Sequence, residues 1–406
     1  MRSEFLAFSP PFIGDEEIDE VVSTLRTPWI STGPKTQQFE EDFATYIGAP
    51  SALAVSSCTD AMLIALAALG VGKGDAVFAP TMTFAATINV IEHLGAEAIL
   101  VDCDTATLNM NTVELARTIE RTVEEGHLKP TVIMPVHYSG RPVDMAPVVD
   151  LAKRYSMAIV EDAAHALPAT YADRLIGSPI EGVTWATAFS FYATKNLCTA
   201  EGGMLTGTPD LLEEAALWRL HGMSRDAWNR YGKGGSWYYE IVRPGFKCNM
   251  TDIQAAMGIH QLQKLNWFQE NRKRVVDAYN SAFDGHPSLQ TPAKDDEVSN
   301  SAWHLYPLRL QLDQFSIDRA AFIDQLTERN IGSSVHFIPI HFHPWFQKHY
   351  GLTESSFPVA EAQFHRLVSL PLHPALSDDD VKDVTDAVLE IAEVFSADSD
   401  SSSVEA

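Results

Sequence analysis

The alternation of strand-like and helix-like segments between residues 51 and 160 constrains the fold of this chain more than any other feature. Short apolar runs predict strands, and the longer amphipathic runs between them predict helices. Strands separated by helices in this way form a mostly parallel sheet with helices on both faces, so the expected fold class is α/β. The expected strands are 51–57, 76–79, 98–101, 131–136 and 158–160, and the expected helices are 60–69, 85–94, 145–155 and one that Asn111 caps, with Glu114 three positions on.

The pattern differs on both sides of this region. Upstream, a helix opening at residues 15–17 carries Ile18, Val21, Val22 and Leu25 on one face, and a second helix carries Phe39, Phe43 and Tyr46. Downstream, residues 228–243 are rich in Gly, Trp and Tyr, which is typical of a long functional loop. The remaining expected elements are helices 211–220, 251–283, 317–329 (capped by Ser316) and 378–395, and strands 305–312 and 334–340.

These elements predict two domains. The larger one, residues 1–258, includes the N-terminal segment, and a smaller α+β domain spans residues 259–396, with the change of domain inside the long helix 251–283. Residues 397–406 are acidic and rich in serine, so we expect a disordered tail.

The composition is that of a soluble globular protein, with 46% hydrophobic and 20% charged residues. A formal net charge of −25 argues against binding to nucleic acid or to anionic lipid, because both need a basic face. The cysteines (Cys58, Cys103, Cys198 and Cys248) lie far apart without a C-x-x-C pair, so reduced thiols are expected rather than disulfides or a zinc site. No signal-peptide core or membrane-length apolar run is visible, which predicts a cytoplasmic protein.

A lysine follows the apolar, β-prone run from Trp185 to Phe191. Lys195 would therefore stand at the carboxyl edge of the sheet, where α/β enzymes bind ligands. A desolvated lysine with a lowered pKa is a Schiff-base nucleophile. The alternative is a surface lysine just past a strand end, and this stretch alone does not decide between them.

Other strand ends supply groups that suit a pyridoxal phosphate cofactor. Ser57, Cys58 and Thr59 stand at a helix N-terminus, where backbone N–H groups and hydroxyls can hold phosphate. Asp162 ends a strand and can pair with a protonated pyridine nitrogen. His165 can reach the ring's phenolic oxygen, and Phe84 can stack on the ring. Considered alone, Ser57 and Thr59 are better explained by helix capping, and core packing explains Phe84 equally well. Asp162 could instead cap the next helix, and His165 could be a core histidine.

Other cofactors fit less well. The chain lacks G-x-G-x-x-G after its first strand and lacks G-x-x-x-x-G-K-[ST], which weakens the dinucleotide and nucleoside triphosphate readings. His336, His341 and His343 lie close in sequence but have no partnering Asp, Glu or Cys pattern, so no metal site is expected.

Nearly the whole chain resembles the DegT/DnrJ/StrS family of sugar-nucleotide aminotransferases, which are fold type I pyridoxal phosphate enzymes. The matching stretches, named by their first residues, begin at Trp29 (WISTGP), Ser56 (SSCTDA), Pro80 (PTMTF), Pro135 (PVHYSG), Glu161 (EDAAHA), Phe189 (FSFYATKN), Glu201 (EGG) and Gly245 (GFKCNMTDIQAA). The stretches at Glu161 and Gly245 are most similar to the branch that aminates C4 of UDP-linked 4-keto sugars, and they resemble those of the aminoarabinose-forming transaminase.

The resemblance implies a role for individual residues. Lys195 would carry the cofactor aldehyde as a Schiff base, Asp162 would pair with the ring nitrogen, His165 would lie near the phenolic oxygen and Phe84 would stack. Phosphate would be held by Ser57, Cys58, Thr59 and Ser190, and by Asn249 from the neighbouring subunit of a homodimer with shared active sites. Candidate substrate contacts are Trp29, Lys247, Arg225 and Arg230.

The expected activity is transfer of an amino group from glutamate to a nucleotide-linked keto sugar in the biosynthesis of cell-surface polysaccharide, lipopolysaccharide or amino sugars, with pyridoxamine phosphate as the intermediate cofactor form. Alternatives within the family are amination at C3, a GDP- or dTDP-linked substrate, glutamine as donor, or a sugar dehydratase. The dehydratase replaces the lysine with histidine, so Lys195 counts against it. A catalytically silent protein of this fold would be expected to lose Lys195 or Asp162.

Overall fold

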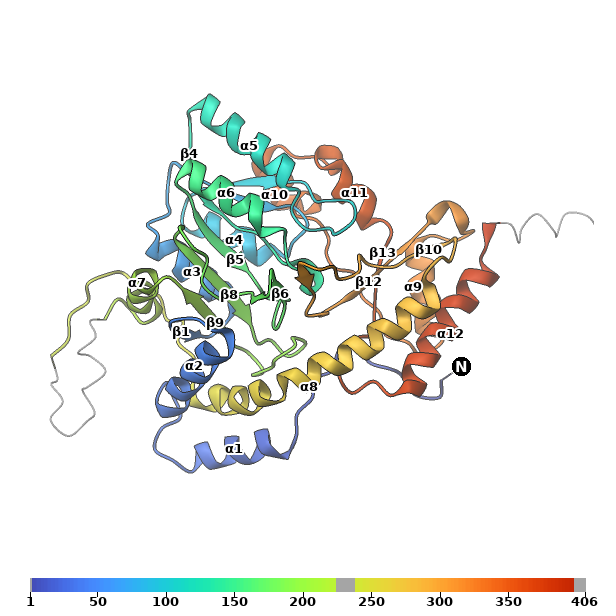
Figure 1. Cartoon of the computed structure of the whole chain (residues 1–406), viewed down its shortest axis with the longest axis horizontal. Helices are drawn as coiled ribbons and strands as arrows, with labels where there is room; N and C mark the ends of the chain where they lie inside the picture. The colour runs from blue at the N-terminus through green and yellow to red at the C-terminus, as the bar shows by residue number, and fades with distance from the viewer. Residues whose placement is uncertain (1, 224–237, 398–406) are drawn as a thin grey trace, which may run out of the picture.

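The centre of the larger part of the molecule is a seven-stranded sheet with the order β1-β9-β8-β5-β4-β2-β3 (Figure 1). The structure is a computed structural model that describes residues 2–223 and 238–397. From β3 to β8 the paired strands are parallel, and β9 runs antiparallel to both of its neighbours. The prediction of a mostly parallel sheet is confirmed. The strands are β1 (Ala52–Val55), β2 (Asp75–Pro80), β3 (Glu97–Val101), β4 (Lys129–Ile133), β5 (Ala158–Asp162), β8 (Trp185–Ser190) and β9 (Gly203–Gly207).

Helices cover both faces of this sheet, and strands β2, β5 and β8 are buried along almost their whole length. One face packs against α3 (Cys58–Ala68), α4 (Ala85–His93) and α7 (Pro209–Arg219). The other face packs against α5 (Thr112–Glu125) and α6 (Met145–Tyr155), and further along against α2 (Pro34–Ile47) and the first part of α8 (Asp252–Phe283). A separate small sheet joins β6 (Thr170–Tyr171), β7 (Arg174–Leu175) and β11 (Ser299–Asn300).

Helix α8 connects the two halves of the molecule (yellow in Figure 1). Its side chains as far as Phe268 pack in the core beneath the large sheet, whereas those from Val275 onward pack in a second core. The second core lies against a three-stranded antiparallel sheet with the order β10-β12-β13. The proposed domain boundary at residue 258 stays a prediction. The elements that follow α8 in the chain are β10 (Leu289–Gln290), β12 (Tyr306–Leu310), α9 (Arg319–Glu328), α10 (Pro344–Tyr350), α11 (Pro358–Phe364), β13 (Leu367–Leu370) and α12 (Asp378–Val394). Of these, α10 packs through Phe346 against the core of the large sheet.

Two expectations about local structure are wrong. Residues 334–340 do not form a strand, because only Ser334 makes an isolated bridge, to Ser369, and the segment then turns along the cavity described below. Helix α9 is capped by Asp318, whose carboxylate accepts from the Ala321 N–H at 2.8 Å, and not by Ser316. Residues 398–406 of the expected tail, and most of the expected loop 228–243, lie outside the described residues.

The first helix, α1 (Asp15–Leu25), places its apolar stripe on the outside. Ile18, Val22 and Leu25 are 52%, 38% and 54% exposed, while Glu17 and Thr24 are buried against the rest of the chain. Lys264 on α8 pairs with the buried Glu17 carboxylate at 2.7 Å and so holds α1 in this orientation. An apolar face that residues 2–223 and 238–397 leave uncovered is typical of a contact with another protein surface.

The sheet determines where the polar strand ends lie. Strands β1, β2, β5 and β8 all point the same way, so the segments that follow them meet at one edge. Helix α3 begins directly after β1, and Phe84 caps α4 after β2. Asp162 closes β5, and Lys195 follows β8.

Candidate active site

A cavity of about 560 Å³ opens at this edge of the sheet, between the large sheet and the segments of the smaller half. Several residues expected from the sequence line it together: Ser57, Cys58, Thr59, Phe84, Asp162, His165, Ser190 and Lys195. Of the lysines and arginines in the described part of the chain, only Lys195 lines this cavity. Strand ends that are far apart in sequence therefore meet around a single amine.

The loop that carries Lys195 is held by its neighbours. The Lys195 N–H donates to the Tyr192 carbonyl at 2.9 Å. The side chain of Asn196 is buried, and its Nδ2 donates to the carbonyl oxygens of Leu167 at 2.9 Å and Ala302 at 2.8 Å. These bonds join the lysine loop both to the turn after β5 and to the segment that leads into β12 (Tyr306–Leu310).

Burial lowers the pKa of the Lys195 amine to about 8, because the ammonium form loses water around it. The negative charge of Asp162 opposes this effect and keeps the pKa from falling further. An amine with this pKa is neutral in about one tenth of the molecules at pH 7, which is far more than for an ordinary lysine. It can therefore act as a nucleophile and as a general base.

Asp162 is buried and its carboxylate is held on both oxygens. Oδ1 accepts from the Ala164 N–H at 3.1 Å, and Oδ2 accepts from the Thr87 hydroxyl at 2.7 Å. The Cys58 thiol lies 3.9 Å from Oδ1, and burial together with the Asp162 charge raises the pKa of that thiol, which stays protonated. The carboxylate is fixed in place and faces the cavity, as a partner for a cationic ring nitrogen must be.

The other end of the cavity is the N-terminus of α3. Ser57 caps the helix, and its hydroxyl accepts from the N–H three residues on. Cys58 and Thr59 supply the first backbone N–H groups of the helix, and Ser190 lines the same cavity. A Cβ on Gly203 of β9 would lie 2.5 Å from the Ser57 carbonyl carbon, so the strand packs directly against this turn. Such an N-terminus is suited to hold phosphate.

Three histidines surround the amine, and two of them were missed by the sequence reasoning. The His165 ring lies 4.3 Å from His304 and stacks on Phe337 at 5.5 Å. Burial lowers the pKa of His165, His304 and His336, in the last case to about 4, so all three are neutral. Since Asn196 donates through Nδ2, its Oδ1 must accept from Nδ1–H of His304 at 3.1 Å.

The missed residues His304, His336, Phe337 and Phe8 all line the cavity. They come from the smaller half and from the N-terminal segment, where no strand-end rule applies. The signal that was present is the His-Phe pair at 336–337, which the sequence reasoning assigned to a strand. His341 lies apart from them, with Nδ1 2.7 Å from the Thr81 hydroxyl, and no cluster of metal-binding side chains occurs within residues 2–223 and 238–397.

Three expected residues do not line the cavity of their own chain. Asn249 donates to the Thr32 hydroxyl at 2.5 Å, and Lys247 bonds to the Asn249 side chain. Trp29 is 44% exposed on the loop that precedes α2. Lys247 and Asn249 therefore lie beside the loop that carries Trp29 and leads into α2. Arg225 and Arg230 lie outside the described residues.

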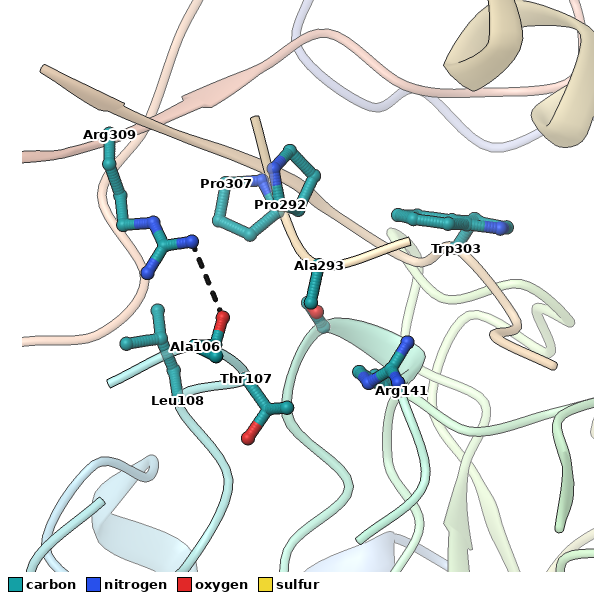
Figure 2. A pocket seen from close by; sticks show the side chains of 10 residues that line it. Ala106, Thr107, Leu108, Arg141, Pro292, Ala293, Trp303, Pro307 and Arg309 are labelled. Atoms are coloured by element: carbon teal, nitrogen blue, oxygen red, sulfur yellow. Dashed lines mark hydrogen bonds between the residues drawn. The ribbon is translucent and has the colours of Figure 1, made fainter. Parts of the chain in front are cut away.

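A second, much smaller pocket lies where the loop after β3 meets β12 (Figure 2). Arg309 closes it, with Nη1 donating to the Thr105 carbonyl at 2.6 Å and Nη2 to the Ala106 carbonyl at 3.3 Å. Its volume is about 10 Å³, which is room for about one water molecule. The Arg309 hydrogen bonds therefore join the two halves of the molecule at this point, and the pocket is too small for a substrate.

The sequence and the fold were compared with known proteins. The model of the DegT/DnrJ/EryC1/StrS aminotransferase family matches residues 11–389. The chain belongs to this family. It is 46% identical over 392 residues to the spore coat polysaccharide biosynthesis protein SpsC of Bacillus subtilis, covering 96% of this chain and 98% of SpsC.

Solved structures agree with this assignment. Spr1654 of Streptococcus pneumoniae, described as a sugar aminotransferase, matches in its PMP form with a TM-score of 0.86 at 34% identity, covering 96% of this chain and 98% of that one. A PLP form of the same protein matches with a TM-score of 0.85 at the same identity, covering 96% of this chain and 99% of that one. PseC of Helicobacter pylori, an aminotransferase involved in pseudoaminic acid biosynthesis, matches with a TM-score of 0.86 at 26% identity, covering 97% of this chain and all of PseC.

This aminotransferase is thus an enzyme that depends on pyridoxal phosphate and acts on sugars. The residues in the cavity fit that cofactor. They offer a reactive amine, a fixed carboxylate and a helix N-terminus, and Nδ1 of His165 is buried without a hydrogen-bond partner among the described residues. No helix in the described ranges is long and apolar enough to cross a membrane.

Proposed function

We propose that this enzyme transfers the amino group of glutamate to the C4 ketone of a UDP-linked 4-keto sugar, for the biosynthesis of a surface polysaccharide. The observation that carries the proposal is the cavity that joins Lys195, Asp162 and the α3 N-terminus. The likeness of the stretches at Glu161 and Gly245 to the branch that aminates C4 supports the substrate. The role in polysaccharide synthesis is supported by the name of SpsC.

Within the proposed site, each part of the cofactor has a partner. Asp162 would pair with the ring nitrogen, Ser57, Cys58, Thr59 and Ser190 would hold the phosphate, and Phe84 would pack on the ring. Phe84 is 63% exposed at the cavity and has room for such a contact. When bound, pyridoxal phosphate supplies an electron-withdrawing ring that stabilises a carbanion at the substrate carbon.

The chain itself contributes the proton transfer. The amine of Lys195, with a pKa of about 8, would take the proton from the Cα of glutamate as general base and deliver it as general acid to the former aldehyde carbon of the cofactor. In the second half of the cycle the direction reverses, and the same amine would take a proton from that cofactor carbon and deliver it to C4 of the sugar. His165, His304 and His336 are neutral, so they add no positive charge that would compete with the ammonium form of Lys195.

The substrates carry carboxylates and phosphates, yet Lys195 is the only cationic side chain of the described residues in the cavity. The remaining positive charge must come from elsewhere. We infer that a second copy of the chain supplies it, with Lys247, Asn249 and Trp29 reaching the partner's cavity. The exposed apolar face of α1 supports a homodimer of this kind.

The test is a panel of UDP-, GDP- and dTDP-linked keto sugars incubated with the enzyme and ¹⁵N-glutamate, with products read by mass and the aminated carbon assigned by NMR. The expected product is a UDP-linked sugar that carries ¹⁵N at C4. Amination at C3, or a GDP- or dTDP-linked product, would instead support the neighbouring branches. Loss of water without nitrogen uptake would establish a dehydratase.

A further inference from the structure

The first residues of the chain join the smaller half of the molecule to the catalytic cavity, and residues 2–9 are called the N-terminal strap here. The strap begins beside α12 (Figure 1), where Arg2 pairs with Asp380 at 2.7 Å and Asp383 at 2.8 Å. Leu6 is buried in the core of the smaller half, and its N–H donates to the Asn330 carbonyl at 2.8 Å.

The other end of the strap reaches the lysine loop. Phe8 lines the cavity, and its ring stacks on His336 with the centroids 5.5 Å apart and the planes 22° from parallel. The Ser9 hydroxyl donates to the carbonyl of Thr194, the residue before Lys195, at 3.3 Å. Phe8 is only partly buried, so it presents part of its apolar ring to the cavity.

A glycine in the smaller half permits this close approach. The Gly332 N–H donates to the Leu6 carbonyl at 2.9 Å. A Cβ on Gly332 would lie 2.8 Å from the Leu6 carbonyl oxygen and 3.1 Å from the Phe8 nitrogen, both backbone atoms that would have to move. The position of Phe8 is therefore fixed by backbone contacts outside the cavity.

We propose that the N-terminal strap is a wall of the sugar subsite and that Phe8 determines specificity by packing against the C–H face of the keto sugar. An aromatic face offers an apolar, weakly negative surface to such C–H groups, whereas glutamate, with two carboxylates and an ammonium group, has little apolar surface to cover it. Phe8 precedes the stretch of the chain that the family model matches, residues 11–389. The proposal rests on the proposed function, since it needs a sugar as the second substrate.

Measuring the two half-reactions separately distinguishes a role of Phe8 in sugar binding from general damage to the active site. In Phe8→Ala, the glutamate half-reaction, followed by loss of the visible absorbance band in a stopped-flow instrument, should keep its rate within about twofold. The KM for a UDP-linked 4-keto-6-deoxyhexose should rise at least about fivefold, the size expected for one lost aromatic contact. Phe8→Leu keeps an apolar side chain, so its sugar KM should lie between the values for the wild-type enzyme and for Phe8→Ala. Equal losses in both half-reactions, or an unchanged sugar KM, would overturn the proposal.

Gly332→Ala tests the strap without touching the cavity. It should raise the sugar KM as Phe8→Ala does and increase hydrogen exchange of residues 2–9, measured by mass spectrometry. Gly72→Ala is the matched control, because its Cβ would meet only the Leu94 carbonyl oxygen at 3.7 Å. If Gly332→Ala loosens residues 2–9 but leaves the sugar KM unchanged, the strap is not part of the subsite. Failure of the wild-type enzyme to aminate any sugar would reject the proposed function instead, and the exchange measurement would still report on the strap.

Discussion

At the scale of single residues, Lys195 and Asp162 differ in how they are prepared for chemistry. Lys195 has a lowered pKa because burial removes water from the ammonium group, and no hydrogen bond among the described residues holds its Nζ. Asp162 is held rigidly by the Thr87 hydroxyl and the Ala164 N–H. The proposed mechanism needs this difference. The amine must shift position to carry a proton from one carbon atom to another, whereas the carboxylate must stay in place beside the ring nitrogen.

The pKa of Lys195 predicts how the apoprotein takes up its cofactor. Only the neutral amine attacks the aldehyde, and a pKa of about 8 means that its neutral fraction falls about tenfold for each pH unit below 8. The rate of loading with pyridoxal phosphate, followed at the visible band, should rise with pH and level off above about pH 8. The same reaction measured with Nα-acetyl-lysine in solution over the same pH range corrects for ionisation of the cofactor itself. A rate that keeps rising to pH 10 would contradict a buried, perturbed amine.

Asp162→Asn should slow the glutamate half-reaction at least about 100-fold, or about 2.7 kcal/mol, because an amide cannot stabilise a protonated ring nitrogen as a carboxylate does. Stopped-flow absorbance measures the rate. A rate within threefold of wild type would mean that Asp162 does not face the ring nitrogen.

The neighbouring Glu161 provides a matched control. It is equally buried but projects from the opposite face of β5, where Oε1 lies 3.0 Å from Nε2 of His137 and Oε2 accepts from the Thr187 hydroxyl. Glu161→Gln should lower the free energy of unfolding by about 1–3 kcal/mol, because it disturbs a buried hydrogen-bond network. The half-reaction rate per folded molecule should stay near the wild-type value.

Most of the cavity residues that follow a strand of the large sheet were predictable from the sequence. Thr59, Phe84, Asp162 and Lys195 each stand where a run of apolar residues ends, and parallel strands bring such positions to one edge. His304 and Phe8 were not predictable in this way. They reach the cavity through the packing of the smaller half and the strap, and neither follows a local sequence pattern.

At the scale of single elements, the contact between β9 and α3 decides how well the phosphate end can form. In Gly203→Ala the new Cβ would lie 2.5 Å from the Ser57 carbonyl carbon and 2.7 Å from the Cys58 nitrogen, so the helix N-terminus must move. The variant should bind pyridoxal phosphate at least about tenfold more weakly, while its affinity for pyridoxal, which lacks the phosphate, should change little. Equilibrium titration of the apoprotein measures both, and equal losses for both ligands would contradict a phosphate site here.

The start of helix α8 was predicted well because a capping box fixes it. Helix α8 begins after Thr251, whose hydroxyl accepts from the Gln254 N–H while Gln254 reaches back to the Thr251 N–H, as in a capping box. The prediction of a strand at residues 334–340 was wrong because alternating apolar residues form a strand only where a partner strand is available. Here Val335 and Phe337 instead pack in a small cluster beside the cavity.

At the scale of the whole molecule, the surface around α1 exposes large apolar side chains that the packing of a single chain does not explain. Ile18 and Leu25 are exposed, and Trp29 and Ile30 follow on the next loop at 44% and 51% exposure. Changing Ile18 and Leu25 together to Asp should convert the proposed dimer into monomers, measured by sedimentation equilibrium, because the charges would stay buried without partners at the interface. A wild-type protein that sediments as a monomer would contradict the dimer directly.

Shared active sites make a sharper prediction than the dimer alone. If Asn249 acts in the partner's cavity, Lys195→Ala and Asn249→Asp damage different halves of each site. In a mixed dimer one site then carries both changes and the other carries neither, because a two-fold interface exchanges the same residues in both directions. Equal amounts of two inactive variants, unfolded and refolded together, should therefore recover about one quarter of the wild-type activity. If Asn249 instead serves its own chain, no site in the mixture is intact and no activity returns, even though the mixed dimer forms and can be isolated by two different affinity tags.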